Sequence, residues 1–302
     1  MPDPFTTQHL IAPADDRRHT PGPGAKPLWN ESWWFPFYDP ETRIGVVTRI
    51  GLLPMQQTAN LWFFVTRDGA LVHDATTLAL PLPEGDIDTG LQVGGLTYRC
   101  VDPLARWRLA FEDQRVQMDV EWRAFSPVHQ WPVPPGSTVE DVPRHVEQSG
   151  WVRGALRLGS ERIALVRAYG HRDHSWGGER DWSKMHHWYY ASGEMGADLS
   201  FNAVKVWLAE DAFITIGCLW DGHETLNVEQ LDVVCQIDPA ARHQTGGVVT
   251  VHDSRGRDWR FDGTVLAHCP VQIVPTRVDD AITEFRVAGR LGYGIIEYGR
   301  QE

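Results

Sequence analysis

Short stretches of alternating apolar and polar residues run through most of the chain. In the clearest stretch, residues 115–125, Val116, Met118, Val120 and Trp122 alternate with Gln117, Asp119, Glu121 and Arg123. A period of two is typical of an antiparallel strand that buries one face and exposes the other. Further runs rich in β-branched and aromatic residues predict strands at 45–50, 201–208, 213–218, 231–236 and 282–287. The pattern therefore predicts a chain that is almost entirely β.

Turn residues separate these runs at the spacing of β-hairpins. Three hairpins are predicted, joining 61–66 to 70–73 across Arg67-Asp68-Gly69, 155–158 to 162–167 across Gly159-Ser160-Glu161, and 248–252 to 258–261 across 253–256. Glycine and proline contribute 28 and 20 residues, which suits many turns and few helices. No long amphipathic helical pattern is present, although 279–285 could form one or two helical turns.

A proline-rich stretch divides the predicted strands into two groups. Five prolines fall within residues 126–144, a density that neither strands nor helices tolerate. We therefore predict a linker there, between an N-terminal β domain at 28–125 and a C-terminal β domain at 145–302. Each half has enough strands for a small antiparallel barrel or sandwich. Residues 1–27 are predicted to form a loose arm that either wraps the body or stays disordered.

Charge and cysteine content exclude several classes of protein. The net charge of -12 repels phosphates, and no basic stripe interleaves with aromatics, so a nucleic acid is not expected as a partner. No apolar stretch reaches the roughly 18 residues of a membrane span, and the N-terminus lacks the pattern of a secretory signal. The cysteines are widely spaced without a CxxC pair, so we expect buried reduced thiols and a cytoplasmic protein.

Tryptophan is unusually frequent, at 14 residues. Indole is large, rigid and electron-rich, which suits a cavity lined for a bulky apolar or cationic guest. The alternative is a β-barrel core that uses tryptophan as filler, and composition alone does not separate the two.

The densest chemistry lies at residues 170–190, GHRDHSWGGERDWSKMHHWYY, which combine four histidines with three acids and two arginines. Such groups are costly to bury unless they are paired or functional. In a strand, His171, Asp173 and Ser175 would share one face, with the intervening residues on the other. A buried Asp173 would have a raised pKa and could act as a general acid. The alternative is an ion pair between Asp173 and Arg180 that fixes the turn.

Other polar positions are weaker candidates. His145 and Glu147 would share a strand face, although a solvated strand end explains them equally well. Glu31 precedes two tryptophans, and Glu297 follows a Gly-Tyr-Gly turn; either acid could simply be solvated. The histidine spacings match no usual zinc motif, so no metal site is predicted. GxSxG, Walker A and GxGxxG motifs are absent, which argues against serine hydrolases, P-loop proteins and Rossmann folds.

The sequence from Gly170 to Gly177 resembles the GxxDHxxG signature of the carotenoid 1,2-hydratase (hydroxyneurosporene synthase) superfamily, in a form typical of an uncharacterised bacterial branch. Members of that superfamily are built from two lipocalin-like β-barrels. The resemblance implies that Asp173 protonates an alkene while His174 and Trp176 hold it or stabilise positive charge. It also implies pericyclase or cyclase chemistry as alternatives, in an apolar pocket without a cofactor. The extra acids Glu179 and Asp181 depart from the pattern and make a carotenoid substrate unexpected.

We therefore predict an all-β protein of two lipocalin-like antiparallel barrels or sandwiches in tandem with little helix. The leading functional hypothesis is a cofactor-independent hydratase, dehydratase, isomerase or cyclase acting on a hydrophobic small molecule such as a terpenoid, steroid or aromatic metabolite. A non-catalytic lipocalin-like carrier and a metal-dependent lyase are the alternatives, and the oligomeric state stays open. The predicted catalytic residues are Asp173, His174, His145 and Glu147, and the predicted substrate-binding residues are Trp176, Trp182, Trp34, Glu31, His187, Tyr189, Arg180, Asp181 and Glu297.

Overall fold

The computed structural model describes residues 11–133 and 136–302 and confirms the predicted all-β fold. Within this part of the chain the helical segments are short 3-10 turns at Pro13–Asp16, Pro54–Gln56 and Trp182–Lys184. Asp279–Phe285, considered as a helical turn, lies inside a strand, so that expectation was wrong. None of the helices in the described ranges is long and apolar enough to cross a membrane.

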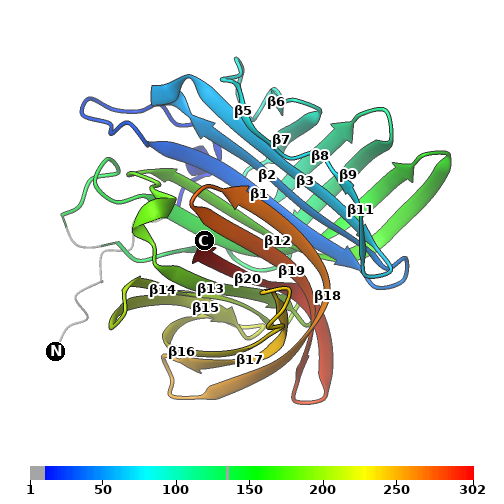
Figure 1. Ribbon diagram of the computed structural model, residues 1–302, viewed down its shortest axis with the longest axis vertical. Helices are drawn as coiled ribbons and strands as arrows, with labels where there is room; N and C mark the ends of the chain where they lie inside the picture. Colours follow the sequence, from blue (N-terminus) through cyan, green and yellow to red (C-terminus); the bar gives the residue numbers. More distant parts are fainter. Residues whose placement is uncertain (1–10, 134–135) are drawn as a thin grey trace. The chain divides into compact units, whose positions relative to one another are not determined.

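The first sheet holds 12 strands among the described residues. The strands are β1 Asn30–Asp39, β2 Ile44–Leu53, β3 Thr58–Arg67, β4 Ala70–Asp74, β5 Thr77–Pro81, β6 Leu91–Val93, β7 Leu96–Asp102, β8 Arg106–Glu112, β9 Val116–Ala124, β10 His129–Gln130, β11 Arg144–Leu158 and β12 Glu161–Gly177. The path through the sheet runs β4-β3-β2-β1-β12-β11-β9-β8-β7-β6, with β10 paired to β11 and β5 to β3 (Figure 1). Two long strands late in this chain order, β11 and β12, therefore lie in the middle of the sheet.

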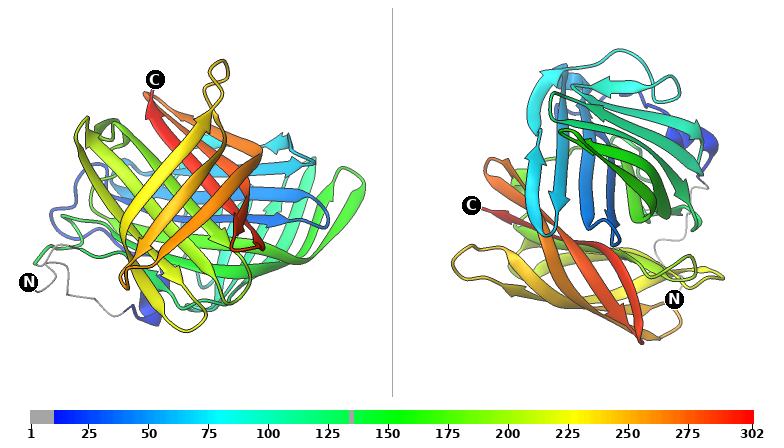
Figure 2. Two further views of the ribbon diagram at one scale, coloured as in Figure 1. Left: turned by 90° about the horizontal axis from the view of Figure 1, so that it is seen from below. Right: turned by 90° about the vertical axis from the view of Figure 1, so that its right-hand side faces the viewer.

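The remaining strands form a closed antiparallel barrel in which each strand pairs with the next and β20 closes on β13 (Figure 2). They are β13 His187–Glu194, β14 Ser200–Ala209, β15 Ala212–Trp220, β16 Thr225–Ile237, β17 Gln244–Asp253, β18 Asp258–Ile273, β19 Thr276–Val287 and β20 Arg290–Gln301. All three predicted hairpins are present, and β9 shows the predicted alternation of buried and exposed residues.

The chain divides into two compact units at positions that differ from the predicted domains. The first unit holds the described residues up to Phe35, Thr48–Phe64 and His73–Arg180; the second holds Pro36–Val47, Val65–Val72 and Asp181–Glu302. The boundary predicted at 126–144 fails because that segment leads back into the same sheet. Its prolines interrupt regular structure, as expected, but β10 within it pairs with β11, and Gly178 N donates to Val139 O at 2.7 Å.

Aromatic side chains fill the core of the first unit. Trp107, Trp122, Phe35 and Tyr98 are fully buried, and Phe35 contacts the other three rings at centroid distances of 5.1–6.0 Å. Much of the tryptophan content is thus core filling. In the second unit a cluster that includes Phe201, Phe261, Phe285 and Ile296 fills the inside of the barrel. The four cysteines are free; Cys218 and Cys269 are buried and the other two are half-buried.

The described part of the N-terminal arm packs against the first unit. Asp16 is fully buried, and its carboxylate Oδ1 accepts a hydrogen bond from Arg172 Nη1 at 2.8 Å. Arg172 is also completely buried and lies over the rings of Trp107 and Trp122. Of the two alternatives for the arm, residues 11–27 follow the one in which it wraps the body; residues 1–10 lie outside the described residues.

Candidate active site

A cluster of ionisable residues lies on one face of the β11–β12 pair. Glu147 faces Asp173 directly across the two strands, His145 faces Ser175, and Ser149 faces His171. Side chains of directly opposed residues in an antiparallel pair lie on the same face, a few ångströms apart. The strand periodicity had predicted which of these residues share a face, and the register now brings the two strands' polar faces together.

This register depends on a β-bulge. A regular ladder continued from the hairpin pair Leu158–Glu161 would place Glu147 opposite Arg172, with Asp173 on the other face. The ladder instead shifts between Val152 and Gly154, where β12 contributes one additional residue. A single-residue shift exchanges the two faces of a strand, so the bulge brings Asp173 to Glu147.

Glu147 is held between two imidazoles. His145 Nε2 lies 2.8 Å from Glu147 Oε1, and His171 Nε2 lies 2.6 Å from Glu147 Oε2. Burial alone would raise the pKa of Glu147, but the charges and hydrogen bonds of the two histidines outweigh it and lower that pKa to about 2. The glutamate is therefore a permanent carboxylate that fixes the orientation of both rings. Ser149 Oγ extends the network to His171 Nδ1 at 3.2 Å.

Asp173 has the opposite electrostatic behaviour. Its residue is half-buried, but Oδ1 is buried and has no hydrogen-bond partner among the described residues. Burial raises the pKa of Asp173 to about 6; His145 opposes the shift and the facing Glu147 carboxylate adds to it. No hydrogen bond or ion pair joins Asp173 to Arg180 in the described part of the chain, and Arg180 Nη2 donates to Ser175 Oγ at 2.6 Å. Asp173 is therefore a carboxyl group that can hold or release a proton near neutral pH.

His129, which the sequence analysis missed, completes this face. It lies opposite Glu147 in the β10–β11 register and is almost fully buried. Burial lowers the pKa of His129 to about 4, which keeps the ring neutral, and its Nε2 has no partner among the described residues. The residue was overlooked because it lies in the proline-rich segment, which was interpreted as a linker. Its position two residues after a proline gave no periodic signal.

His174 does not join this cluster. Its Nε2 lies 3.0 Å from Glu31 Oε1, and its ring stacks on Trp33 at a centroid distance of 4.6 Å. His19 of the arm completes the group, with Nδ1 at 2.7 Å from the same glutamate oxygen and its ring stacked on Trp176 at 4.4 Å. The expectation that His174 holds Asp173 does not fit this geometry, because adjacent residues of β12 point to opposite faces.

The three donor atoms of His19, Glu31 and His174 lie within 4.8 Å of one another, a donor set that could hold a metal ion. Metal binding through His174 Nε2 would leave a buried Nδ1–H donor, and Nδ1 has no partner in the described ranges. Metal-bound histidines normally donate that second N–H. As a hydrogen-bonded group, Glu31 accepts from both rings and no donor is left unsatisfied. The geometry therefore fits a hydrogen-bonded link between the arm and the sheet better than a metal centre.

Comparison with known proteins places this site in a family context. The model of a family described as a domain of unknown function, DUF7064, matches residues 12–302. The chain belongs to this family. A search of curated proteins found no match.

Solved structures with the same fold support the tandem lipocalin-like architecture. A Nitrosomonas europaea protein described as a candidate AttH superposes on the DUF7064 chain with a TM-score of 0.69 and 14% identity, covering 90% of this chain and 92% of the other. Kievitone hydratase from Nectria haematococca gives 0.65 and 13%, covering 95% and 92%. CghA gives 0.65 and 12%, covering 91% and 89%. These likenesses confirm the double-lipocalin fold expected from the GxxDHxxG resemblance.

Two further predicted residues of this DUF7064 chain, Trp34 and Arg180, lie near the face of the β11–β12 pair that carries Asp173 and Glu147. Ser32 Oγ lies 3.1 Å from Ser175 Oγ, so β1 contributes Ser32 and, by alternation, the buried Trp34 to the same face as Asp173. Arg180 contacts the same face through its hydrogen bond to Ser175. Trp176 and Glu31 lie on the opposite face with His174.

The other predicted residues belong to the second unit. Asp181 caps a 3-10 turn by accepting from Ser183 N at 3.1 Å, and this hydrogen bonding together with the Ser183 hydroxyl lowers the pKa of Asp181. Trp188 Nε1 donates to Glu297, and the Trp182 and Trp188 rings lie 5.4 Å apart. His187 and Tyr189 point into the barrel, as described below.

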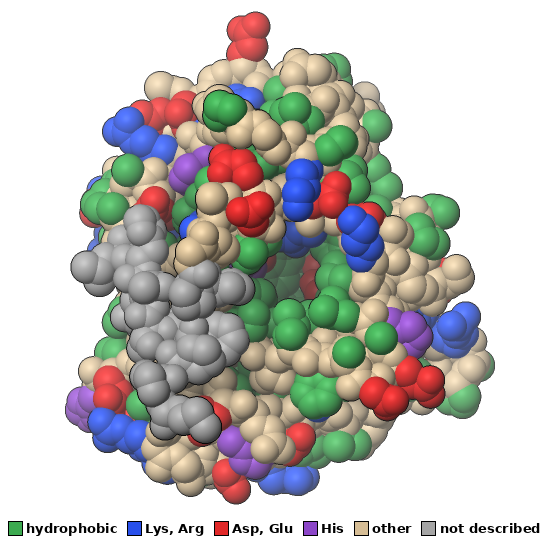
Figure 3. Space-filling model, turned by 90° about the vertical axis from the view of Figure 1, so that its left-hand side faces the viewer, with side chains coloured by type: hydrophobic (Ala, Val, Ile, Leu, Met, Phe, Trp, Pro, Cys, Tyr) green, Lys and Arg blue, Asp and Glu red, His purple; other side chains and the backbone are tan. Residues whose placement is uncertain are grey.

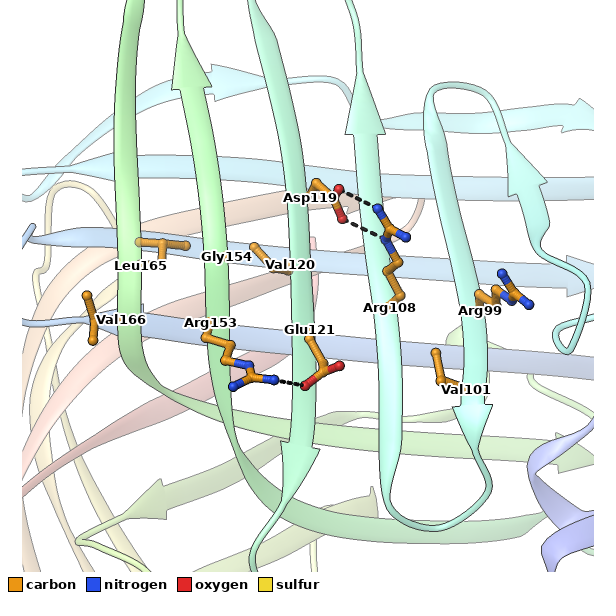
Figure 4. Close-up of a pocket in the computed structure, with 10 residues that line it drawn as sticks. All are labelled: Arg99, Val101, Arg108, Asp119, Val120, Glu121, Arg153, Gly154, Leu165 and Val166. Atoms are coloured by element: carbon orange, nitrogen blue, oxygen red, sulfur yellow. Dashed lines mark hydrogen bonds and ion pairs between the residues drawn. The ribbon is translucent and has the colours of Figure 1, made fainter.

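A surface groove of about 800 Å³ crosses β7, β8, β9, β11 and β12 (Figure 4). Four of its five charged side chains form ion pairs, Arg108 with Asp119 at 2.6 Å and Arg153 with Glu121 at 2.9 Å; the fifth, Arg99, donates from Nε to the carbonyl of Asp88 at 3.3 Å. Neither acid of these pairs is buried, so the groove does not have the character of a reaction centre. On the face shown in Figure 3, Lys and Arg side chains lie among Asp and Glu side chains without a continuous basic area.

Proposed function

We propose that this protein is an acid–base enzyme of the hydratase, dehydratase or cyclase type that acts on a hydrophobic small molecule through Asp173. One observation carries the proposal: Asp173 and Glu147 face each other, yet their pKa values are shifted in opposite directions, to about 6 and about 2. Paired carboxyl groups whose environments separate their pKa values are typical of sites that assign one group to proton transfer and the other to a fixed charge.

Hydration of an alkene would use these two roles directly. Protonated Asp173 gives its proton to one alkene carbon, and a cation develops on the other. The permanent charge of Glu147 stabilises that cation through space. A water molecule then forms the new carbon–oxygen bond, and its surplus proton returns to the Asp173 carboxylate, which restores the starting state. Dehydration is the reverse sequence, and a cyclisation would replace the water by an internal nucleophile.

The surroundings of Asp173 support a hydrophobic substrate. Trp151 and Tyr169 are half-buried, and their rings meet at a centroid distance of 4.9 Å. Trp151 follows Ser149 by two residues on β11, so its ring lies next to the cluster on the same face. The fold shared with kievitone hydratase, whose name states a hydration, supports the same class of reaction. We propose Trp34, Trp151 and Arg180 as substrate-contacting residues, and His145 as a residue whose ring Glu147 orients toward substrate.

The proposal can be tested without knowing the substrate. Purified protein is incubated with a lipophilic extract of its source cells in oxygen-18-labelled water, and products are compared by mass spectrometry with those of Asp173→Asn and of Asp119→Asn, an exposed acid on β9. We expect the wild type and Asp119→Asn to incorporate or remove water, or to form an isomer of unchanged mass, and Asp173→Asn to do neither.

The pH dependence of the rate gives a second readout. A limb near pH 6 is expected from the pKa of Asp173. Equal turnover by Asp173→Asn would refute the role of Asp173. Binding of a metabolite that all three proteins return unchanged would instead identify a carrier.

A further inference from the structure

The inside of the second unit's barrel changes character along its length. Ala191, Ala203, Phe285 and Ile296 belong to the apolar cluster and therefore mark the inward positions of β13, β14, β19 and β20. The ladders that join these four strands are regular over the residues concerned. Alternation can therefore be followed from the apolar cluster toward the end of the barrel where β13 begins.

Two layers of inward residues lie above the apolar cluster. Three alanines and one isoleucine form the layer at the cluster's edge, where Ala191 pairs with Ala203 and Ile296, and Ile296 with Ala281. The next layer, the inner layer, pairs Tyr189 with Lys205 and Tyr298, and Tyr298 with Asp279. The outer layer pairs His187 with Trp207 and Arg300, and Arg300 with Arg277.

Aromatic rings form a wall in these layers. Tyr189 stacks on Tyr298 at 5.0 Å, His187 stacks on Trp207 at 4.3 Å, and Lys205 Nζ lies 5.1 Å from the Trp207 ring. All five side chains are half-buried. Partly exposed rings that point into a barrel are placed to contact a small molecule rather than to fill a core.

Three residues of this barrel, Asp279, Gln244 and Arg300, have buried polar atoms without a hydrogen-bond partner among the described residues. Asp279 is 1% exposed; its Oδ2 lies 3.1 Å from His268 Nδ1, while Oδ1 has no partner in the described part of the chain. Gln244 spans the barrel to donate to the carbonyls of Asp279 and Ile296 at 2.7 and 2.8 Å, which leaves its Oε1 unpartnered among the described residues. Arg300 is 5% exposed. Its Nη2 donates to Glu302, while Nε and Nη1 have no hydrogen-bond partner among the described residues.

The geometry points to a binding site for a hydroxylated aromatic carboxylate inside this barrel end. The unsatisfied acceptors of Asp279 and Gln244 require a donor, such as a phenolic hydroxyl, and the unsatisfied guanidinium N–H groups of Arg300 require an anion. Consecutive inward residues of a strand are about 7 Å apart. A single benzene ring with substituents at opposite ends spans that separation and stacks on the aromatic wall. This site does not rest on the proposed reaction, because all its residues belong to the second unit.

Titration calorimetry with 4-hydroxybenzoate tests the inference, with phenol, benzoate and 4-hydroxybenzylamine as matched probes. We expect 4-hydroxybenzoate to bind more tightly than phenol or benzoate, and 4-hydroxybenzylamine to bind weakest. Arg300→Met should weaken 4-hydroxybenzoate binding about tenfold or more and leave phenol binding unchanged, which a misfolded barrel would not do. Arg260→Met, which removes an exposed arginine from the outside of β18, is the matched control and should change neither.

Failure of 4-hydroxybenzoate to bind, or equal affinity in Arg300→Met and wild type, would overturn the site. Neither result would affect the proton-transfer role of Asp173, because turnover is measured separately. Conversely, inactivity of Asp173→Asn leaves this binding experiment unchanged.

Discussion

Replacing Asp173 by asparagine should stabilise the protein at alkaline pH and have little effect at acidic pH. The ionised carboxylate of Asp173 is unfavourable in the folded state because burial of the charge raises its pKa from 3.8 to about 6. Asparagine has nearly the same shape and no charge. The substitution thus removes the cost of ionisation and keeps the packing of β12.

The magnitude follows from linkage between protonation and folding. The folded state binds the Asp173 proton more tightly than the unfolded state, so stability falls as pH rises from about 4 to about 6 and stays low above that range. A shift of about two pKa units corresponds to about 3 kcal/mol at pH 8, but only about 0.5 kcal/mol at pH 4. Partial exposure of Asp173 reduces both values. The unpartnered amide of the variant adds a cost of about 1 kcal/mol that does not depend on pH.

Urea unfolding at pH 4 and pH 8 measures the difference. We expect the stabilising effect of Asp173→Asn to be about 2 kcal/mol larger at pH 8 than at pH 4. Asp119→Asn, on strand β9 of the same sheet, is the control. Its carboxylate accepts from Arg108, which lowers the pKa of Asp119, so this variant should instead lose a little stability at pH 8. An Asp173→Asn effect that is equal at both pH values would refute the assignment of a buried, proton-sharing carboxyl group.

Four other outcomes follow from the first unit; urea unfolding measures the first three and thermal unfolding the fourth. Glu147→Gln should lower the free energy of unfolding by about 3 kcal/mol at pH 7, because the lowered pKa of Glu147 stabilises the folded state above pH 4.5. This stabilisation is lost as pH falls toward 2. A loss below about 1 kcal/mol would contradict the stabilisation of the Glu147 carboxylate by the two histidines. Gly154→Ala should cost at least about 2 kcal/mol, since φ is +148° and a Cβ would meet Asp119 O at 2.3 Å. Asp16→Asn should cost about 3–5 kcal/mol by leaving buried Arg172 unpaired, and it should also expose the arm to proteolysis. Chelation of metals should leave the melting temperature unchanged, because the hydrogen bonds of Glu31 hold the arm; a lower melting temperature with chelator would identify a metal site there.

Local sequence pattern was sufficient for the strands and hairpins. The alternation from Val116 to Arg123 decides which side chains are buried, and a strand needs nothing beyond its neighbours in sequence to show it. Pairing between distant strands has no such local signal. The proline-rich segment shows where regular structure stops, but not that β11 returns to pair with β9. The predicted domain boundary therefore came too early in the chain.

The same limit explains which parts of the candidate site were predictable. Residues within one strand, such as His145 with Glu147, were grouped correctly by alternation. Residues that reach the site from elsewhere were missed or placed in the wrong role. His129 arrives on a two-residue strand, and His19 arrives from the arm and pairs with Glu31. His174 was given a role beside Asp173 by the family resemblance, although adjacent strand residues point apart.

The bulge in the β11–β12 ladder connects the fold to the chemistry. Without it, the predicted hairpin would set Glu147 opposite Arg172, an ion pair that favours stability and leaves no perturbed carboxyl. With it, Glu147 faces another acid, Asp173, and adds to the rise that burial causes in the pKa of Asp173. The sheet thus adopts a less favourable charge arrangement at a single position, through a backbone irregularity next to Gly154, whose φ of +148° favours glycine. Departures from the most stable arrangement concentrate at functional sites, and the charge arrangement on the face that contains Asp173 supports the proposal that this face carries the proton-transfer group.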